Sequence, residues 1–178
     1  MDGVTRVGAV DVHYDDDGGA RAALIVCDDS TCSTVTFEHV VRIARTLPYE
    51  SGALYKRELP CIQAVLTSAP PVDLLLVDGY ATLDPKGRPG LGAHAARAFG
   101  IPVIGVAKTS FRSATHAIEV IRGAATRPLY VTTAGGVPLD KAARLVAAVA
   151  GSHRLPDALA RADRLARGRE EPRTIGPS

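Results

Sequence analysis

Residues 4–40 read VTRVGAVDVHYDDDGGARAALIVCDDSTCSTVTFEHV, and this stretch decides the fold class. Apolar residues alternate with polar ones over Val4–Tyr14, which predicts a strand, and the DDDGG run at 15–19 predicts a turn. Two more strands are predicted over Ala20–Cys27 and Ser33–Val40. Neighbouring strands joined by a glycine-containing turn are typical of an antiparallel meander, so we expect the chain to open with one.

Beyond this meander, helices and strands are expected to alternate. The predicted strands are Val72–Val77, Ile101–Ala107 and Arg127–Thr133, and the predicted helices are Gly52–Leu66, Leu91–Phe99, Thr115–Arg122, Leu139–Ala150 and Asp157–Arg167. A meander followed by alternation predicts an α/β fold whose mixed sheet joins the antiparallel three-strand meander to parallel strands, with helices on both faces. We expect one domain over residues 1–167 and a disordered tail over 168–178, because GREEPRTIGPS has no apolar period.

The composition is that of a soluble globular protein. The chain has 178 residues, of which 46% are hydrophobic and 22% charged. Its net charge of +2 neither requires nor excludes a nucleic-acid partner. No stretch approaches about 20 uninterrupted apolar residues, and the N-terminus does not resemble a signal peptide. Three cysteines without a zinc-binding spacing favour reduced thiols. We therefore expect a cytoplasmic monomer with no membrane partner.

Two acidic residues lie on predicted strands. Asp11 sits between Val10 and Val12 inside the first strand, and Asp78 ends the apolar run LLLV. A carboxylate is seldom buried without a partner or a metal ion, and ligands of open α/β sheets gather beyond the carboxyl ends of strands. The alternatives are a solvent-facing position on an edge strand for Asp11 and a turn-capping role for Asp78.

Two further acidic residues fall on the apolar faces of predicted helices. Glu58 lies four residues after Leu54 and four before Ile62, and Asp163 lies four residues after Leu159. The alternatives are that Glu58 is exposed to solvent and that Asp163 forms a surface ion pair with a neighbouring arginine.

Four carboxylates directed at one region would repel one another unless they share a cation. Carboxylate oxygens suit a hard ion, so the pattern predicts a Mg²⁺ site, with Mn²⁺ as an alternative, made by Asp11, Glu58, Asp78 and Asp163. One or two such ions can bind a phosphate and activate water. Lys108 ends the strand IPVIGVA, where it can contact that phosphate, and exposure to solvent is an equal alternative.

Several motifs, in this order and spacing, resemble the endonuclease V family. They are AVDVHY at 9–14, PYESGALYKRELP at 48–60, LLLVDGY at 74–80, IPVIGVAKTSF at 101–111 and RLPDALARAD at 154–163. The resemblance covers most of the chain from residue 7 to residue 167. It implies a ribonuclease-H-like fold and a metal-dependent endonuclease, a phosphodiester hydrolase of DNA repair. The implied cleavage lies 3′ to inosine in DNA or RNA and leaves a 5′-phosphate.

The resemblance also gives roles to individual residues. Asp11, Glu58 and Asp78 match the family's metal-binding catalytic carboxylates, Asp163 falls at a fourth ligand, and Lys108 matches the catalytic lysine. The residues implied to contact nucleic acid, either in a strand-separating wedge or around a flipped base, are Tyr49, Gly52, Leu54, Gly79 and Leu91. A deaminated base pairs poorly, so extruding it costs less than extruding a normal base.

The last predicted helix carries Arg161, Arg164 and Arg167. These arginines are candidates for contacts with backbone phosphates, and the alternative is an ordinary solvated helix face.

The sequence departs from the family pattern around base recognition. In Gly79–Lys86 (GYATLDPK), the residues Ala81, Asp84 and Lys86 stand where the family has Gly, His and Arg, and Thr132–Gly136 (TTAGG) lacks a family histidine. The alternatives are a catalytically altered relative that only binds nucleic acid, and a nuclease with another nucleic-acid substrate such as RNA or branched DNA. A receiver-like phosphoacceptor domain is a further alternative, which the opening meander does not favour.

Overall fold

The computed structural model describes residues 5–176 and contains, in that part of the chain, one seven-stranded sheet and four α-helices. The strands are β1 (Val7–Tyr14), β2 (Ala20–Cys27), β3 (Val35–Ile43), β4 (Leu74–Asp78), β5 (Val103–Ala107), β6 (Ile118–Val120) and β7 (Leu129–Ala134). The helices are α1 (Tyr55–Thr67), α2 (Leu91–Phe99), α3 (Leu139–Ala148) and α4 (Asp157–Ala166). The predictions for Val4 and for the last two residues of the tail lie outside the described residues.

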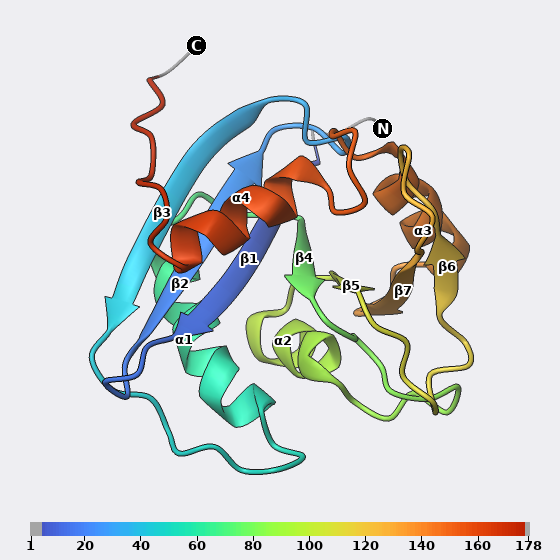
Figure 1. The fold of residues 1–178 in the computed structure, drawn as a ribbon, viewed down its shortest axis with the longest axis horizontal. Helices are drawn as coiled ribbons and strands as arrows, with labels where there is room; N and C mark the ends of the chain where they lie inside the picture. The colour runs from blue at the N-terminus through green and yellow to red at the C-terminus, as the bar shows by residue number, and fades with distance from the viewer. Residues whose placement is uncertain (1–4, 177–178) are drawn as a thin grey trace.

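The strands form the predicted mixed sheet. β1, β2 and β3 make the antiparallel meander. β1 pairs in parallel with β4, and β4 pairs in parallel with β5, so the central strands point the same way (Figure 1). β7 runs antiparallel to β5, and β6 antiparallel to β7, which gives the order β3-β2-β1-β4-β5-β7-β6. The antiparallel return of β7 was not specified by the sequence pattern.

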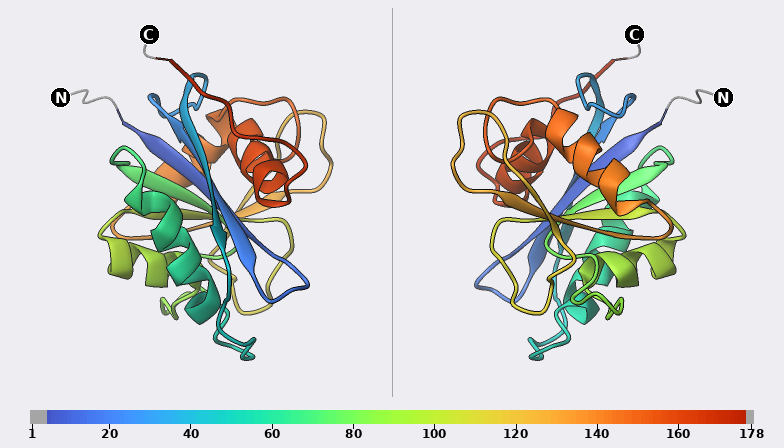
Figure 2. Two further views of the ribbon diagram at one scale, coloured as in Figure 1. Left: turned by 90° about the vertical axis from the view of Figure 1, so that its left-hand side faces the viewer. Right: turned by 90° about the vertical axis from the view of Figure 1, so that its right-hand side faces the viewer.

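Helices cover both faces of the sheet, as predicted (Figure 2). α1 and α2 pack on one face through buried residues such as Val65, and α3 and α4 pack on the other through residues such as Leu165. Ala9 belongs to the cluster beneath α3 and α4. Because side chains alternate along a strand, Asp11 points to that same face, toward α4.

One predicted helix is wrong. Thr115–Arg122 contains the short strand β6, in which Ile118 pairs with Val131 and Val120 pairs with Leu129. Ile and Val are β-branched and favour a strand once a partner strand is available, and this tertiary pairing overrides the weak local preference for helix.

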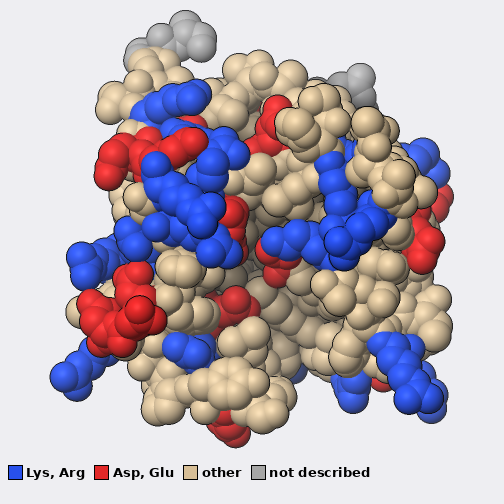
Figure 3. Space-filling view, in the orientation of Figure 1, with Lys and Arg blue, Asp and Glu red and all other residues tan. Residues whose placement is uncertain are grey.

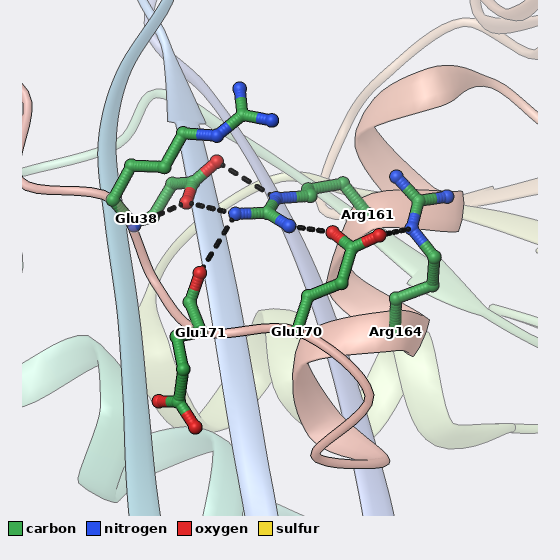
Figure 4. A network of polar contacts seen from close by, with 6 residues as sticks. Glu38, Arg161, Arg164, Glu170 and Glu171 are labelled. Atoms are coloured by element: carbon green, nitrogen blue, oxygen red, sulfur yellow. Dashed lines mark hydrogen bonds and ion pairs between the residues drawn. The ribbon is translucent and has the colours of Figure 1, made fainter.

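The segment after α4 has no helix or strand, but a polar network ties it to the rest of the chain (Figure 4). Arg161 of α4 donates to both carboxylate oxygens of Glu38 on β3, at 3.0 and 2.8 Å. Glu170 pairs with Arg161 and Arg164, and the Arg173 N–H donates to Glu38 at 2.8 Å. Where the sequence predicts a disordered tail, residues 170–173 therefore contact both α4 and β3.

Within residues 5–176, no helix combines the length and the apolar composition needed to cross a bilayer. Cys27, Cys32 and Cys61 are buried, and none of them is in a disulfide among the described residues.

Candidate active site

The carboxyl ends of β1 and β4 bring two of the predicted acids together. The parallel register pairs Val10 with Val77, so Asp11 and Asp78 come next on neighbouring strands. β4 ends at Asp78, and the chain turns away at Gly79, whose φ of +124° favours glycine. β1 continues past this point. The end of β4 therefore leaves an opening beside β1, in the position where ligands of open α/β sheets bind.

α1 supplies the third acid. Its buried residues Cys61, Ile62 and Val65 pack against the sheet. Glu58 lies four residues before Ile62 and so shares that face, in the first turn of the helix. Its side chain is therefore directed at the sheet and not into solvent.

Asp11, Glu58 and Asp78 line one small pocket, together with residues that include Ile62 and Leu91. The pocket volume is about 10 Å³, roughly the room that one water-sized sphere needs. Figure 3 shows acidic side chains around a hollow at the centre of this face, with basic side chains on both sides of it. The pocket that these residues line is thus the size of a single ion or water molecule.

Two carboxyl groups of this pocket, Asp11 and Glu58, have strongly raised pKa values. Burial raises the pKa of Asp11 to about 7, and the Asp78 and Asp163 carboxylates add to the rise, against one hydrogen bond from the Val12 N–H. Burial also raises the pKa of Glu58 to about 7, again with a contribution from Asp11 and Asp78. Carboxyl groups with such raised pKa values in a pocket are typical of functional sites.

Two basic side chains partly neutralise the negative charge of Asp78 and Asp163. Lys108, directly after β5, places its Nζ 3.0 Å from Oδ2 of Asp78. Directly after α4, Arg167 donates from Nε to Oδ1 of Asp163 at 2.8 Å. Burial raises the pKa of Asp163, but the hydrogen bond and charge of Arg167 outweigh it, so the pKa is lowered overall. Asp163 therefore forms the surface ion pair considered above and also interacts with Asp11.

The donor set fits a hard divalent cation in its chemistry. The four predicted ligands all offer carboxylate oxygens, and Asp11 and Glu58 are carboxyl groups whose pKa values are raised by burial and by neighbouring acids. Among residues 5–176, however, no three or more His, Cys, Asp or Glu side chains are spaced to hold a metal ion as they stand. Asp78 and Asp163 are engaged by their basic partners, so an ion in the pocket would draw these two carboxylates away from those contacts.

Lys108 is held in place by a segment that the sequence analysis did not identify. Arg154, in the connection between α3 and α4, donates to the carbonyl oxygens of Lys108 and Pro128. The buried Arg122 fixes that connection by donating to the carbonyl oxygens of residues 149, 151, 153 and 154. Arg154 falls within the RLPD motif, but nothing in the sequence pattern indicates which group it contacts.

The five residues expected to contact nucleic acid fall into two groups. Tyr49, Gly52 and Leu54 lie before α1, where Tyr49 and Leu54 are exposed and Gly52 has a φ of +77°. Gly79 follows β4, and Leu91 begins α2 and lines the acidic pocket. The second group therefore adjoins the acids, whereas the first forms an exposed edge at the start of α1.

The structure argues against a phosphate contact by Arg161. Its side chain is buried and paired with Glu38 and Glu170. Arg164 pairs with Glu170, and Arg167 with Asp163, but both of these arginines stay partly exposed. The interpretation of the helix as a solvated basic face is therefore wrong for Arg161.

Comparison with known proteins identifies the family. The family model for Endonuclease V matches residues 1–164. The chain belongs to the endonuclease V family. The endonuclease V of Azotobacter vinelandii is 35% identical to it, over 90% of this chain and 81% of the relative. The endonuclease V of Streptomyces coelicolor is also 35% identical, over 93% of this chain and 79% of the relative. Membership of the endonuclease V family implies a nuclease.

Solved structures of endonuclease V confirm the ribonuclease-H-like fold predicted from the sequence. The Streptomyces avermitilis enzyme superposes with a TM-score of 0.77 at 30% identity, over 93% of this chain and 82% of that one. Human endonuclease V gives a TM-score of 0.75 at 27% identity, over 94% of this chain and 85% of the human one. Endonuclease V of Ciona intestinalis, solved in complex with a 23mer DNA containing an inosine, has a TM-score of 0.78 over 93% of this chain and 85% of that one. Its sequence is only 18% identical, so this likeness shows the fold alone.

Proposed function

We propose that this protein is a magnesium-dependent endonuclease that hydrolyses a phosphodiester 3′ to inosine in nucleic acid, as a step of DNA repair. The observation that carries the proposal is the placement of Asp11, Glu58 and Asp78 around one pocket, with Lys108 3.0 Å from Asp78. Family membership supports nuclease activity. The inosine-containing DNA bound by the Ciona relative supports the choice of substrate.

The residues at and beside the pocket would have different roles in the reaction. Asp11, Glu58 and Asp78, with Asp163 as a fourth ligand, would hold one or two Mg²⁺ ions, or Mn²⁺, through carboxylate oxygens. Bound Mg²⁺ lowers the pKa of water and offsets charge on a phosphate. Lys108 presents its ammonium group beside the same pocket, where it stabilises negative charge on the phosphate oxygens in the transition state. Water adds across the P–O3′ bond, which leaves a 3′-hydroxyl and a 5′-phosphate.

The two groups of residues around the start of α1 and beside the acids would contact the nucleic acid. The exposed ring of Tyr49 is available to separate strands at the start of α1. Gly52 and Leu54 on that side, and Gly79 and Leu91 beside the acids, would enclose the extruded base. A deaminated base lowers the free-energy cost of extrusion because its pairing is weak.

Cleavage of matched oligonucleotides tests the proposal. The substrates carry one inosine in DNA, one inosine in RNA, or no inosine, each with and without Mg²⁺. We expect Mg²⁺-dependent cleavage 3′ to the inosine, and a loss of about 10²-fold or more in kcat for Asp78→Asn and Lys108→Met. Asp140→Asn is the matched control, because Asp140 is exposed on α3 and pairs only with Arg144 among the described residues.

The other outcomes separate the alternatives. Binding without cleavage of every substrate would support a catalytically altered relative. Equal cleavage of substrates with and without inosine would support a nuclease with a different specificity. Cleavage by Asp78→Asn at the wild-type rate would contradict the assignment of the pocket.

A further inference from the structure

Two aromatic rings lie on the chain segments that follow Asp78 and Lys108. Tyr80 comes two residues after Asp78, and Phe111 comes three residues after Lys108. Asp78 and Lys108 are themselves in contact at 3.0 Å. The rings of Tyr80 and Phe111, here called the aromatic pair, have centroids 5.8 Å apart and planes inclined at 51°. The aromatic pair is therefore placed where the two chain segments leave the site.

Phe111 does not serve the hydrophobic core. Its side chain is 42% exposed and belongs to neither core cluster, whereas Phe37 and Phe99 pack against the cluster beneath α1 and α2. Aromatic residues make up only 4% of the chain. A single exposed apolar residue is ordinary. Phe111 is distinguished by the Tyr80 ring beside it, and both rings follow shortly after the paired residues Asp78 and Lys108 in the chain.

The segments that carry the two rings are held rigidly together. The Tyr80 hydroxyl donates to the Thr109 carbonyl oxygen at 2.7 Å, and the Ser113 hydroxyl donates to the Leu83 carbonyl oxygen at 2.7 Å. The loop after β4 and the loop after β5 run side by side at the lower right of Figure 1.

Two more contacts cross between the same loops. The Thr82 hydroxyl and Nε2 of His116 are 2.7 Å apart, and Arg88 donates to the Ser113 hydroxyl at 3.3 Å. Ala81, next to Tyr80, donates its N–H to the Thr132 hydroxyl at 2.8 Å. Because the loops are already fixed, a ligand that contacts the rings would lose little conformational entropy in ordering them.

We propose that the aromatic pair is a stacking surface for the nucleobase that flanks the bond to be cut, on the Lys108 side of the site. The inference rests on the proposed function. Every nucleobase has a flat π-face that stacks on aromatic side chains with little dependence on sequence. A phosphate contacted by Lys108 would bring its adjacent base to the aromatic pair. The stacked base would then orient the phosphate relative to the acids.

Fluorescence of a base analogue tests the stacking directly. The probes are single-stranded oligonucleotides with one inosine and 2-aminopurine at successive positions on either side of it. Binding is measured without Mg²⁺, so that the strand stays intact, for the wild type, Phe111→Leu and Phe111→Ala. We expect one probe position at which 2-aminopurine is quenched by the wild type and not by either variant. The dissociation constant for the inosine strand should rise about tenfold in both.

The leucine variant separates stacking from simple apolar contact. Leu retains much of the apolar volume of Phe but has no π-face, so quenching and affinity equal to the wild type in Phe111→Leu would overturn the proposal. Ile121→Ala is the matched control, because Ile121 is 62% exposed beyond the edge strand β6, away from the acids. We expect Ile121→Ala to bind like the wild type.

The test distinguishes this inference from the function on which it rests. If the wild type fails to cleave inosine-containing strands with Mg²⁺, the proposed function fails. If the wild type cleaves and Phe111→Ala and Phe111→Leu bind and quench normally, only the stacking surface fails.

Discussion

Arg161 on α4 and Glu38 on β3 lie 123 residues apart in sequence and form a two-point ion pair, with N–O distances of 3.0 and 2.8 Å. Their side chains are only 9% and 2% exposed, so water screens the pair poorly. Asp163 follows Arg161 by two residues on the same helix. The pair therefore fixes the helix that carries Asp163, the acid that interacts with Asp11.

Removal of one partner of this pair should destabilise the protein strongly. Arg161→Met leaves the Glu38 carboxylate buried without its main partner, so we expect the free energy of unfolding in urea to fall by about 3–5 kcal/mol. Arg144→Met is the control, because Arg144 forms an exposed pair with Asp140, and it should cost at most about 0.5 kcal/mol. The double variant Glu38→Met with Arg161→Met should recover part of the loss. Equal effects of Arg161→Met and Arg144→Met would contradict the role of the pair.

The same pair should make stability depend on acid pH. Burial raises the pKa of Glu38, but hydrogen bonds from Arg161 and the Arg173 N–H outweigh it, and the pKa lies below the ordinary 4.5. A lowered pKa in the folded state means that the contribution of Glu38 is complete above about pH 4.5. It is lost as the pH falls through the lower folded value. The difference in unfolding free energy between the wild type and Glu38→Gln should therefore shrink below pH 4.5, and a difference that is flat from pH 7 to pH 3 would refute this.

Mg²⁺ should stabilise the wild type through the acidic pocket. A ligand that binds only the folded state adds about 2.7 kcal/mol at one hundred times its dissociation constant. We expect the melting temperature of the wild type to rise with Mg²⁺ and that of Asp11→Asn to respond little. Without metal, Asp11→Asn should be at least as stable as the wild type, because it removes a buried carboxyl next to Asp78 and Asp163. A full Mg²⁺ response in Asp11→Asn would place the ion elsewhere.

Arg154 should act on catalysis through Lys108. Arg154→Met removes the donor to the Lys108 carbonyl oxygen, so the ammonium group loses its fixed position. A misplacement of about 1 Å can lower kcat by up to about 10²-fold. We expect kcat to fall while KM stays nearly unchanged, and Arg154→Lys to restore part of the rate. Arg127→Met, at a nearby exposed arginine, is the control. A fall in kcat that only follows lost folding stability would argue for a purely structural role.

Gly105 on β5 should tolerate no side chain. A Cβ at this position would lie 2.4 Å from the Ala81 nitrogen and 2.6 Å from the Gly79 carbonyl oxygen, both backbone atoms of the loop after Asp78. Gly105→Ala must displace that loop, so we expect a loss of about 1–3 kcal/mol in stability together with lower cleavage activity. Gly8→Ala on β1 is the comparison, because its Cβ would meet only side chains, at 3.2 Å or more. A milder effect of Gly105→Ala than of Gly8→Ala would contradict this account.

Local patterns in the sequence were sufficient for the meander and for the positions of the acids. Alternation along residues 10–14 and the apolar run at residues 22–27 define two strands whatever lies around them, and the apolar run before Asp78 defines the end of a buried strand. Helical spacing alone placed Glu58 toward the sheet, because Ile62 is on the same face. The convergence of Asp11 and Asp78 then follows from the parallel pairing of β1 with β4.

Structural features that depend on contacts between residues far apart in the sequence could not be predicted. The strand β6 exists because β7 returns antiparallel beside it. The surroundings of Glu38 depend on residues more than 120 positions later, so a local pattern shows neither its burial nor the anchoring of residues 170–173. The contact between Arg154 and the Lys108 carbonyl oxygen has no sequence pattern, since any arginine can donate to any exposed carbonyl oxygen.

The exposed ring of Phe111 offers a spectroscopic opportunity, since the chain contains no tryptophan. A Phe111→Trp variant would carry a single indole emitter a few residues from Lys108. Its emission would change as a strand arrives and leaves, with no background from other indoles. Stopped-flow mixing could then time substrate capture separately from bond cleavage in this protein.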